Sequence, residues 1–156
     1  DMVKVEAHAA QAPVVEALSR AGVPVCAHFG LRPQRVGQLG GYRVQGRDEA
    51  GAQQVLDDAQ ALEAAGADVL LVECLSAAVA ARVREQTRRP LIGIGAGADC
   101  DGQILVLQDM LGITPGQPPR FSHDFLADTG RIQTALEAYV EAVRTRQFPQ
   151  LQHTFE

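Results

Sequence analysis

Apolar and polar residues repeat with two different periods along this chain, and segments of the two kinds follow one another. Residues 2–6 (MVKVE) put their valines on one side and Lys4 and Glu6 on the other, which is the two-residue repeat of a strand. Residues 12–22 have a proline near the start and a glycine at the end, which predicts a helix. The apolar run at residues 23–30 predicts a second strand.

The same succession continues to residue 95. Residues 48–66 combine an acidic first turn, a helical spacing of apolar side chains and a terminal glycine, so they predict a second helix. Residues 67–73 have a continuous apolar middle, as in a strand of a covered parallel sheet. A helix at residues 76–87 and a strand at residues 90–95 follow. Strands that alternate with helices in this way predict a parallel α/β fold.

Other segments are less regular. Residues 31–47 are rich in Gly, Arg and Gln without a sustained period, which predicts a long loop, and loops of this length are usually functional. Residues 103–113 fit a short helix or a strand equally well. After a break at residues 114–119 (TPGQPP), residues 129–148 predict a long amphipathic helix.

Composition narrows the class of protein. The 156 residues, 46% hydrophobic and 21% charged, predict one globular domain over residues 1–156. The net charge of -5 is dispersed, and no apolar run approaches the roughly 20 residues of a membrane span, so we expect neither a nucleic-acid nor a membrane partner. The three cysteines cannot all pair, and Cys26 and Cys74 lie in strand-like runs typical of buried thiols. We therefore expect a cytoplasmic protein that acts on small molecules.

Polar side chains gather toward the ends of the predicted strands. Lys4 and Glu6 lie on the first, His28 on the second and Glu73 at the end of the third. Ligands bind at the carboxyl ends of parallel strands, so we expect these residues to share one cavity. Simpler interpretations are a surface ion pair for Lys4 and Glu6 and a core histidine for His28. Glu73 follows an apolar run that would strip its carboxylate of water, which favours a general base.

The glycine-rich stretch GIGAGADCDGQ, residues 93–103, has three possible interpretations: a phosphate cradle, a metal site or a turn. An isolated glycine cluster is weak evidence for phosphate binding. Gly93 and Gly95 can allow close backbone packing, and Asp99 and Asp101 can orient a loop by bonding to its backbone. We predict a tight turn that narrows the rim and assign it no metal. The chain also lacks the CxxC and HExxH spacings of zinc sites.

Several stretches together resemble one family. They occur in nearly the same order and spacing as in ketopantoate hydroxymethyltransferases, and they are VKVE, GVPVCAHFGLRPQ, LGGYRVQGR, ALEAAGADVLLVEC, GIGAGADCDGQILVLQDMLG and RQFPQLQHTF. The resemblance implies transfer of a hydroxymethyl group from 5,10-methylenetetrahydrofolate to 3-methyl-2-oxobutanoate, giving 2-dehydropantoate in pantothenate biosynthesis. It also implies Mg²⁺ as the metal and a large homo-oligomer, typically a decamer. The implied fold is a (β/α)8 TIM-type barrel, of which this chain would be the C-terminal half: about four parallel βα units plus C-terminal helices.

The resemblance also implies roles for four residues. Lys4 would contact the keto-acid, Glu6 would belong to the magnesium site, His28 would lie beside the substrate and Glu73 would be the proton acceptor. These residue types suit the reaction, because a base must remove the proton at C3 and positive charge must stabilise the resulting enolate.

The chain departs from the family pattern in two respects. Ala7 and His8 stand where the family usually has two glycines, and the family's two magnesium-binding aspartates lie on strands upstream of position 1. About four βα units are present, whereas a closed barrel needs eight, so we expect the open edges to pair with a complementary N-terminal half or another copy. Two alternatives stay open: a non-catalytic barrel fragment or assembly module without the metal, and a related magnesium-dependent keto-acid lyase or mutase.

Overall fold

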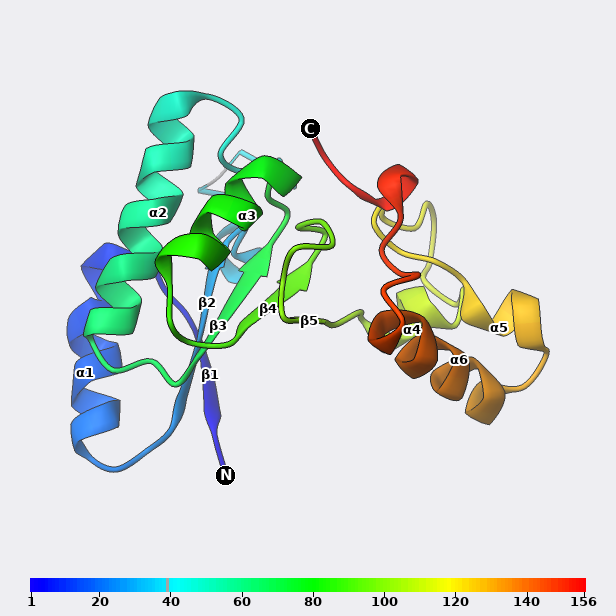
Figure 1. Cartoon of the computed structure of the whole chain (residues 1–156), viewed down its shortest axis with the longest axis horizontal. Helices are drawn as coiled ribbons and strands as arrows, with labels where there is room; N and C mark the ends of the chain where they lie inside the picture. Colours follow the sequence, from blue (N-terminus) through cyan, green and yellow to red (C-terminus); the bar gives the residue numbers. More distant parts are fainter. Residues whose placement is uncertain (39) are drawn as a thin grey trace.

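The computed structural model describes residues 1–38 and 40–156 and consists of alternating strands and helices over its first half (Figure 1). The four strands and three helices predicted up to residue 95 are confirmed, with ends that differ from the predictions by one or two residues. They are β1 (Val3–Glu6), α1 (Ala12–Arg20), β2 (Val25–Gly30), α2 (Glu49–Ala64), β3 (Val69–Glu73), α3 (Ala77–Gln86) and β4 (Leu91–Ile94).

The strands form one parallel sheet whose spatial order, β1-β2-β3-β4-β5, is also the order along the chain. β5 (Gly102–Gln103) is a short edge strand, and α4 (Leu107–Met110) follows it, so the segment predicted as either strand or helix contains both. In the register, Glu6 lies opposite His28 and His28 lies opposite Leu71. This α/β architecture with a parallel sheet is the one that the sequence predicts.

One face of the sheet is covered by α1, α2 and α3 (Figure 1). We call it the helix face. Alternate strand residues pack there against the apolar sides of the helices, because successive side chains of a strand point to opposite faces. The strand residues of this core are Val25, Ala27, Phe29, Leu70, Val72 and Leu91, and the helix residues include Val15, Val55, Leu56, Leu62, Val79 and Val83.

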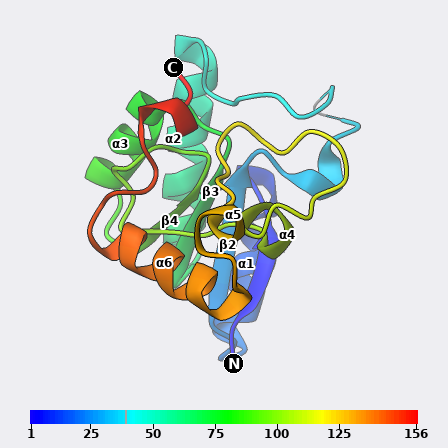
Figure 2. The same ribbon diagram turned by 90° about the vertical axis from the view of Figure 1, so that its right-hand side faces the viewer.

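The C-terminal part of the chain lies on the opposite side of the sheet (Figures 1 and 2). There the sheet contributes Leu71 and Ile94 to a second apolar cluster with Phe121, against which Phe155 packs. Farther out, α5 (Phe125–Thr129) and α6 (Ile132–Arg144) enclose a third cluster. Its buried members are Met110, Leu111, Phe125, Ala135 and Phe148.

The helix predicted over residues 129–148 is wrong in its extent. The chain bends at Gly130, whose φ of 69° is left-handed and whose amide donates to the carbonyl of Leu126, so α5 ends there. The second helix begins at Ile132 and ends at Arg144. The amphipathic period was correct for α6, but periodicity does not locate a break at a single glycine.

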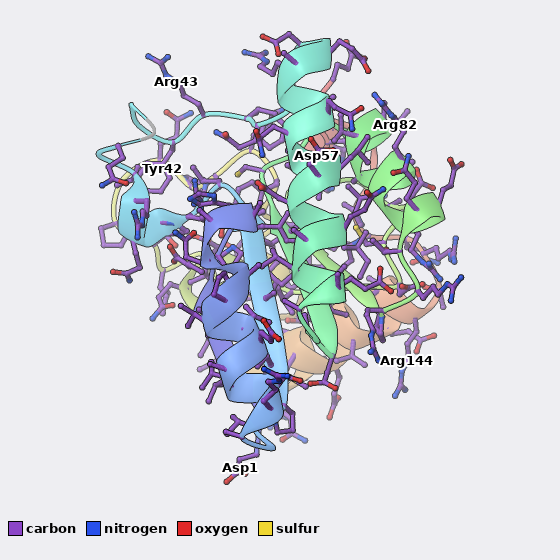
Figure 3. The ribbon with its side chains drawn as sticks, turned by 90° about the vertical axis from the view of Figure 1, so that its left-hand side faces the viewer. Asp1, Tyr42, Arg43, Asp57, Arg82 and Arg144 are labelled. Carbon is purple, nitrogen blue, oxygen red and sulfur yellow. The ribbon has the colours of Figure 1, made fainter. Side chains whose placement is uncertain are left out.

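The predicted loop at residues 31–47 contains one short 3-10 helix, η2 (Pro33–Arg35), and residue 39 lies outside the described residues. The amide of Gln34 donates to the carboxylate of Glu6, and the amide of Gln45 donates to the carbonyl of Cys74 at 2.8 Å. The loop is therefore tied to the ends of β1 and β3. Tyr42 and Arg43, close to the second tie, project from the body of the protein (Figure 3).

The glycine-rich stretch at residues 93–103 contains the end of β4, the connection at residues 95–101 and β5, so the chain reverses only in its middle and the prediction of a turn over the whole stretch is wrong in extent. A Cβ added at Gly93 would lie 2.7 Å from the sulfur of Cys100, and one added at Gly95 would lie 2.6 Å from the ring of Phe121. The carboxylate of Asp101 accepts the amide of Leu91 at 2.9 Å and so closes the turn onto the start of β4. The glycines are thus explained by close packing against neighbouring side chains, and Asp101 by its hydrogen bond to the backbone.

The end of the chain returns to the sheet. Phe155 forms a parallel bridge with Ser76, and its carbonyl accepts the amide of Ala77 at 2.9 Å, at the start of α3. Its ring packs edge-on against Phe121 with the centroids 6.3 Å apart. Among the described residues, none of the helices is both long and apolar enough to cross a membrane.

Candidate active site

The four residues singled out from the sequence lie on one face of the sheet, which we call the site face. Strand side chains alternate, so Lys4 and Glu6 share a face, and the register aligns Glu6 with His28. Glu73 is the last residue of β3, two residues beyond Leu71, which lies opposite His28. The side chains thus occupy three adjacent strands, a width of about 10 Å at ~4.8 Å per strand spacing.

His28 and Glu73 are in direct contact. Nε2 of His28 lies 3.1 Å from Oε2 of Glu73, and the side chains are 4% and 13% exposed. Although this distance is short enough for a hydrogen bond, neither ring nitrogen of His28 has a hydrogen-bond partner in the described part of the chain, because the angular geometry is not met. The two side chains are therefore in contact without a hydrogen bond of regular geometry.

The simpler interpretation of His28, a core histidine bonded to a backbone carbonyl, does not fit this structure. A buried polar atom without a partner costs free energy, and the few that persist in native proteins usually have a functional reason. Here two such atoms lie on one ring, beside a carboxylate, at the carboxyl end of the sheet.

Glu6 is partly buried and is already hydrogen-bonded. Its two carboxylate oxygens lie 3.3 and 3.0 Å from the amide nitrogen of Gln34. The carboxylate therefore orients the start of the loop after β2, a contact that the sequence pattern did not predict because 28 residues separate the partners.

Lys4 is exposed and lies on the site face two residues before Glu6, with Cys26 as its register partner. No ion pair with Glu6 or any other described residue is present, so the surface ion pair considered from the sequence is not formed. The positive charge of Lys4 opposes the rise that burial imposes on the pKa of the Cys26 thiol. The ammonium group is thus available to a ligand on this face.

The two residues that replace glycines lie outside the site face. Ala7 is fully buried in the helix-face core, so its methyl group points away from Lys4 and Glu6. His8 caps the 3-10 helix η1 (Ala9–Gln11), because its ring accepts the amide of Ala10. Neither side chain therefore fills the space in front of the strand ends.

Burial suppresses the acidity of the neighbouring thiols. It raises the pKa of Cys74 to about 12, with the charge of Glu73 as the second cause, and the pKa of Cys100 is also raised to about 12. All three cysteines are free thiols. The thiols of Cys74 and Cys100 are therefore overwhelmingly protonated at neutral pH, which disfavours them as nucleophiles.

The described residues do not form a metal site by themselves. They contain no group of three or more His, Cys, Asp or Glu side chains that could hold an ion. Magnesium is bound by carboxylates together with water and substrate oxygens, and Glu6 offers one carboxylate that already accepts a backbone hydrogen bond. Two pockets of about 190 and 460 Å³ open beside the C-terminal segment, and none of the four candidate residues lines either of them.

The family model described as ketopantoate hydroxymethyltransferase matches residues 1–151. Over 154 residues the chain is 60% identical to the 3-methyl-2-oxobutanoate hydroxymethyltransferase of Alkalilimnicola ehrlichii, covering 99% of this chain and 56% of that protein. Proteins of the same name from Halorhodospira halophila and Marinobacter nauticus are 56% and 54% identical over 155 residues. These matches cover 99% of this chain and 56% and 59% of the two relatives. The chain thus spans between 56% and 59% of the length of these three relatives.

Proposed function

This chain belongs to the ketopantoate hydroxymethyltransferase family, and on that basis we propose that it carries the catalytic base of hydroxymethyl transfer from 5,10-methylenetetrahydrofolate to 3-methyl-2-oxobutanoate. The observation that carries this proposal is the contact between buried His28 and Glu73 at the carboxyl end of a parallel sheet. The product is 2-dehydropantoate, an intermediate of pantothenate biosynthesis.

Glu73 acts as the base. Its carboxylate takes the proton from C3 of the keto-acid, and the electron pair of the broken C–H bond passes into an enolate. Water hydrolyses the methylene bridge of the folate, which breaks both of its C–N bonds and releases tetrahydrofolate and the one-carbon unit as formaldehyde. C3 of the enolate forms the new carbon–carbon bond to the formaldehyde carbon as the C=O π bond opens, and the resulting alkoxide takes the proton back from Glu73 to become the hydroxyl of the product. The low exposure of Glu73, 13%, keeps water from competing for the carboxylate.

His28 and Lys4 hold the keto-acid. The imidazole of His28 lies beside Glu73 and offers a ring nitrogen to a keto-acid oxygen. The exposed ammonium of Lys4 supplies positive charge to the carboxylate of the substrate and to the developing enolate. Magnesium, when bound, would add Lewis-acid stabilisation of the enolate, and Glu6 would supply one of its ligands.

Completion of the site needs residues beyond those described. Five consecutive parallel strands with helices on the outer face support assignment of this sheet to the wall of a (β/α)8 barrel. We propose that complementary N-terminal strands, on a longer polypeptide or a separate one, close the barrel and complete the magnesium site, and that the assembled protein is a homo-oligomer. Its free cysteines fit a reducing compartment such as the cytoplasm.

The base assignment is tested by proton exchange at C3. Incubation of 3-methyl-2-oxobutanoate with magnesium and the barrel completed by its N-terminal strands in deuterated water should introduce deuterium at C3, measured by proton NMR. Glu73→Gln keeps the shape of the side chain and removes the base, so exchange should fall by about two to four orders of magnitude. Glu85→Gln is the matched control, because Glu85 is exposed on α3 away from the strand ends. Full exchange in Glu73→Gln would refute the assignment.

A second candidate function follows from the incomplete metal site. Without three convergent ligands in the described residues, the chain is also suited to be a non-catalytic barrel module that assembles with a partner. Calorimetric titration with magnesium separates the two candidates: a module without the metal gives no heat with the ion, alone or with the keto-acid. A related keto-acid lyase or mutase would exchange C3 without forming a hydroxymethyl product from the folate.

A further inference from the structure

Asp58 is a buried carboxylate that belongs to no part of the site face. It lies on α2 and is 8% exposed, on the apolar side of the helix with Val55 and Leu62. Its Oδ1 accepts the backbone amide of Ala9 at 2.9 Å and the side-chain amide of Gln54 at 3.0 Å. A buried carboxylate is tolerated when it is hydrogen-bonded in this way, and bonds to a charged acceptor are the stronger kind.

The segment that Asp58 holds is the turn directly after β1. The amide of Ala7 donates to the carbonyl of His28 at 2.8 Å, which fixes the beginning of the turn on β2. The amide of Ala9 donates to Asp58, which fixes its end on α2. The strand that carries Lys4 and Glu6 therefore leaves the sheet along a path fixed on both sides.

We propose that Asp58 is a positioning residue for the candidate site. By holding Ala9, it fixes the exit of β1 and with it the places of Lys4 and Glu6 relative to Glu73. The proposal rests on the proposed function, because that function assigns Lys4 and Glu6 to the keto-acid and its metal. Glu73 and His28 belong to β3 and β2, so their positions do not depend on this tether.

The neighbouring residue provides a matched control. Asp57 lies on the same helix and accepts a hydrogen bond from Gln53, four residues earlier, at 2.8 Å, as Asp58 does from Gln54. Asp57 is exposed on the outer side of α2, where Figure 3 labels it. Asp57→Ala therefore removes the same kind of helical contact and leaves Ala9 untouched.

Hydrogen exchange tests the tether without reference to activity. In Asp58→Ala, the amide of Ala9 should exchange on the order of tenfold faster or more, because it loses a hydrogen bond to a charged acceptor. Asp58→Asn keeps an Oδ1 acceptor and should restore most of the protection, and Asp57→Ala should match the unsubstituted chain. The amide of Leu71 in β3 reports on global unfolding. Equal acceleration at Leu71 and Ala9, or unchanged exchange at Ala9, would overturn the proposal.

Steady-state kinetics test whether the tether positions the site. With the C3 exchange assay, Asp58→Ala should raise the KM for 3-methyl-2-oxobutanoate about tenfold, because Lys4 holds the substrate carboxylate, and should also lower kcat, because Lys4 and the metal on Glu6 stabilise the enolate. Asp58→Asn should recover most of the lost affinity. An unchanged KM in Asp58→Ala, or the same effect in Asp57→Ala, would refute the positioning role. If the barrel completed by its N-terminal strands neither binds the keto-acid nor exchanges C3, the proposed function fails instead, and the exchange of the Ala9 amide still decides whether Asp58 holds the turn.

Discussion

Gly95 has a left-handed backbone, and a side chain placed there would collide with the ring of Phe121. The free energies that these two effects cost in a Gly95→Ala variant can be measured separately. The φ of Gly95 is 62°, and a Cβ there would lie 2.6 and 2.8 Å from Cδ1 and Cγ of Phe121. Gly95→Ala therefore incurs the left-handed penalty of about 1–2 kcal/mol. The overlap with the ring of Phe121 adds about 1–3 kcal/mol of overpacking. We expect the free energy of unfolding to fall by about 2–5 kcal/mol in total.

Gly130 supplies the control for the backbone part. Its φ is 69°, and a Cβ there meets nothing within 4 Å. Gly130→Ala should therefore lower the free energy of unfolding by only the left-handed penalty of about 1–2 kcal/mol. Both substitutions change the unfolded chain in the same way, so that contribution cancels in the comparison.

Urea denaturation followed by circular dichroism measures both variants, with an unchanged m value as the criterion for comparing them. A double-mutant cycle isolates the contact: in a Phe121→Ala background, Gly95→Ala should cost no more than Gly130→Ala. The reasoning is refuted if Gly95→Ala and Gly130→Ala agree within about 0.5 kcal/mol, or if removal of the ring leaves the cost of Gly95→Ala unchanged.

Two further predictions follow from pKa shifts. Burial raises the pKa of Cys74 and Cys100 to about 12, so at pH 8 only about one thiol in ten thousand is ionised. Both thiols should therefore react with iodoacetamide far more slowly in the native protein than in urea. Equal labelling rates, measured by mass spectrometry, would contradict this. Burial and the neighbouring His123 lower the pKa of His153 from its ordinary 6.5. The folded protein therefore favours the neutral ring of His153. The contribution of this ring to the stability of the fold is complete above pH 6.5 and is lost as the pH falls through the lowered pKa. An NMR titration from pH 7.5 to 5 should show residues 150–156 loosening as this happens.

The first half of the fold was predictable because its signals are local. Helices there begin at proline or capping residues, α1 and α2 end near glycines, and strands appear as short apolar runs, so a single window of sequence contains the information. The later part depends on contacts between distant segments. Gly130 divides two helices within one amphipathic pattern, and β5 is a strand only because it pairs with β4.

The candidate site likewise has contacts that the sequence predicts and contacts that it does not. That Glu73 and His28 would lie near each other followed from strand order alone, because both lie toward the carboxyl ends of neighbouring parallel strands. The tether at Asp58 did not, because its partner Ala9 is 49 residues away. Its signal in the sequence is an acidic residue on the apolar stripe of α2, three residues after Val55 and four before Leu62.

The contact of Phe155 with the start of α3 means that this part of the fold cannot be completed until residue 155 has been synthesised. The amide of Ala77 has its acceptor in a carbonyl that is translated 78 residues later, counting from 77 to 155. At about 5–20 residues per second, a nascent chain waits about 4–16 s between making that donor and making its acceptor. Until residue 155 leaves the ribosome, the amide of Ala77 lacks this acceptor and is solvated by water.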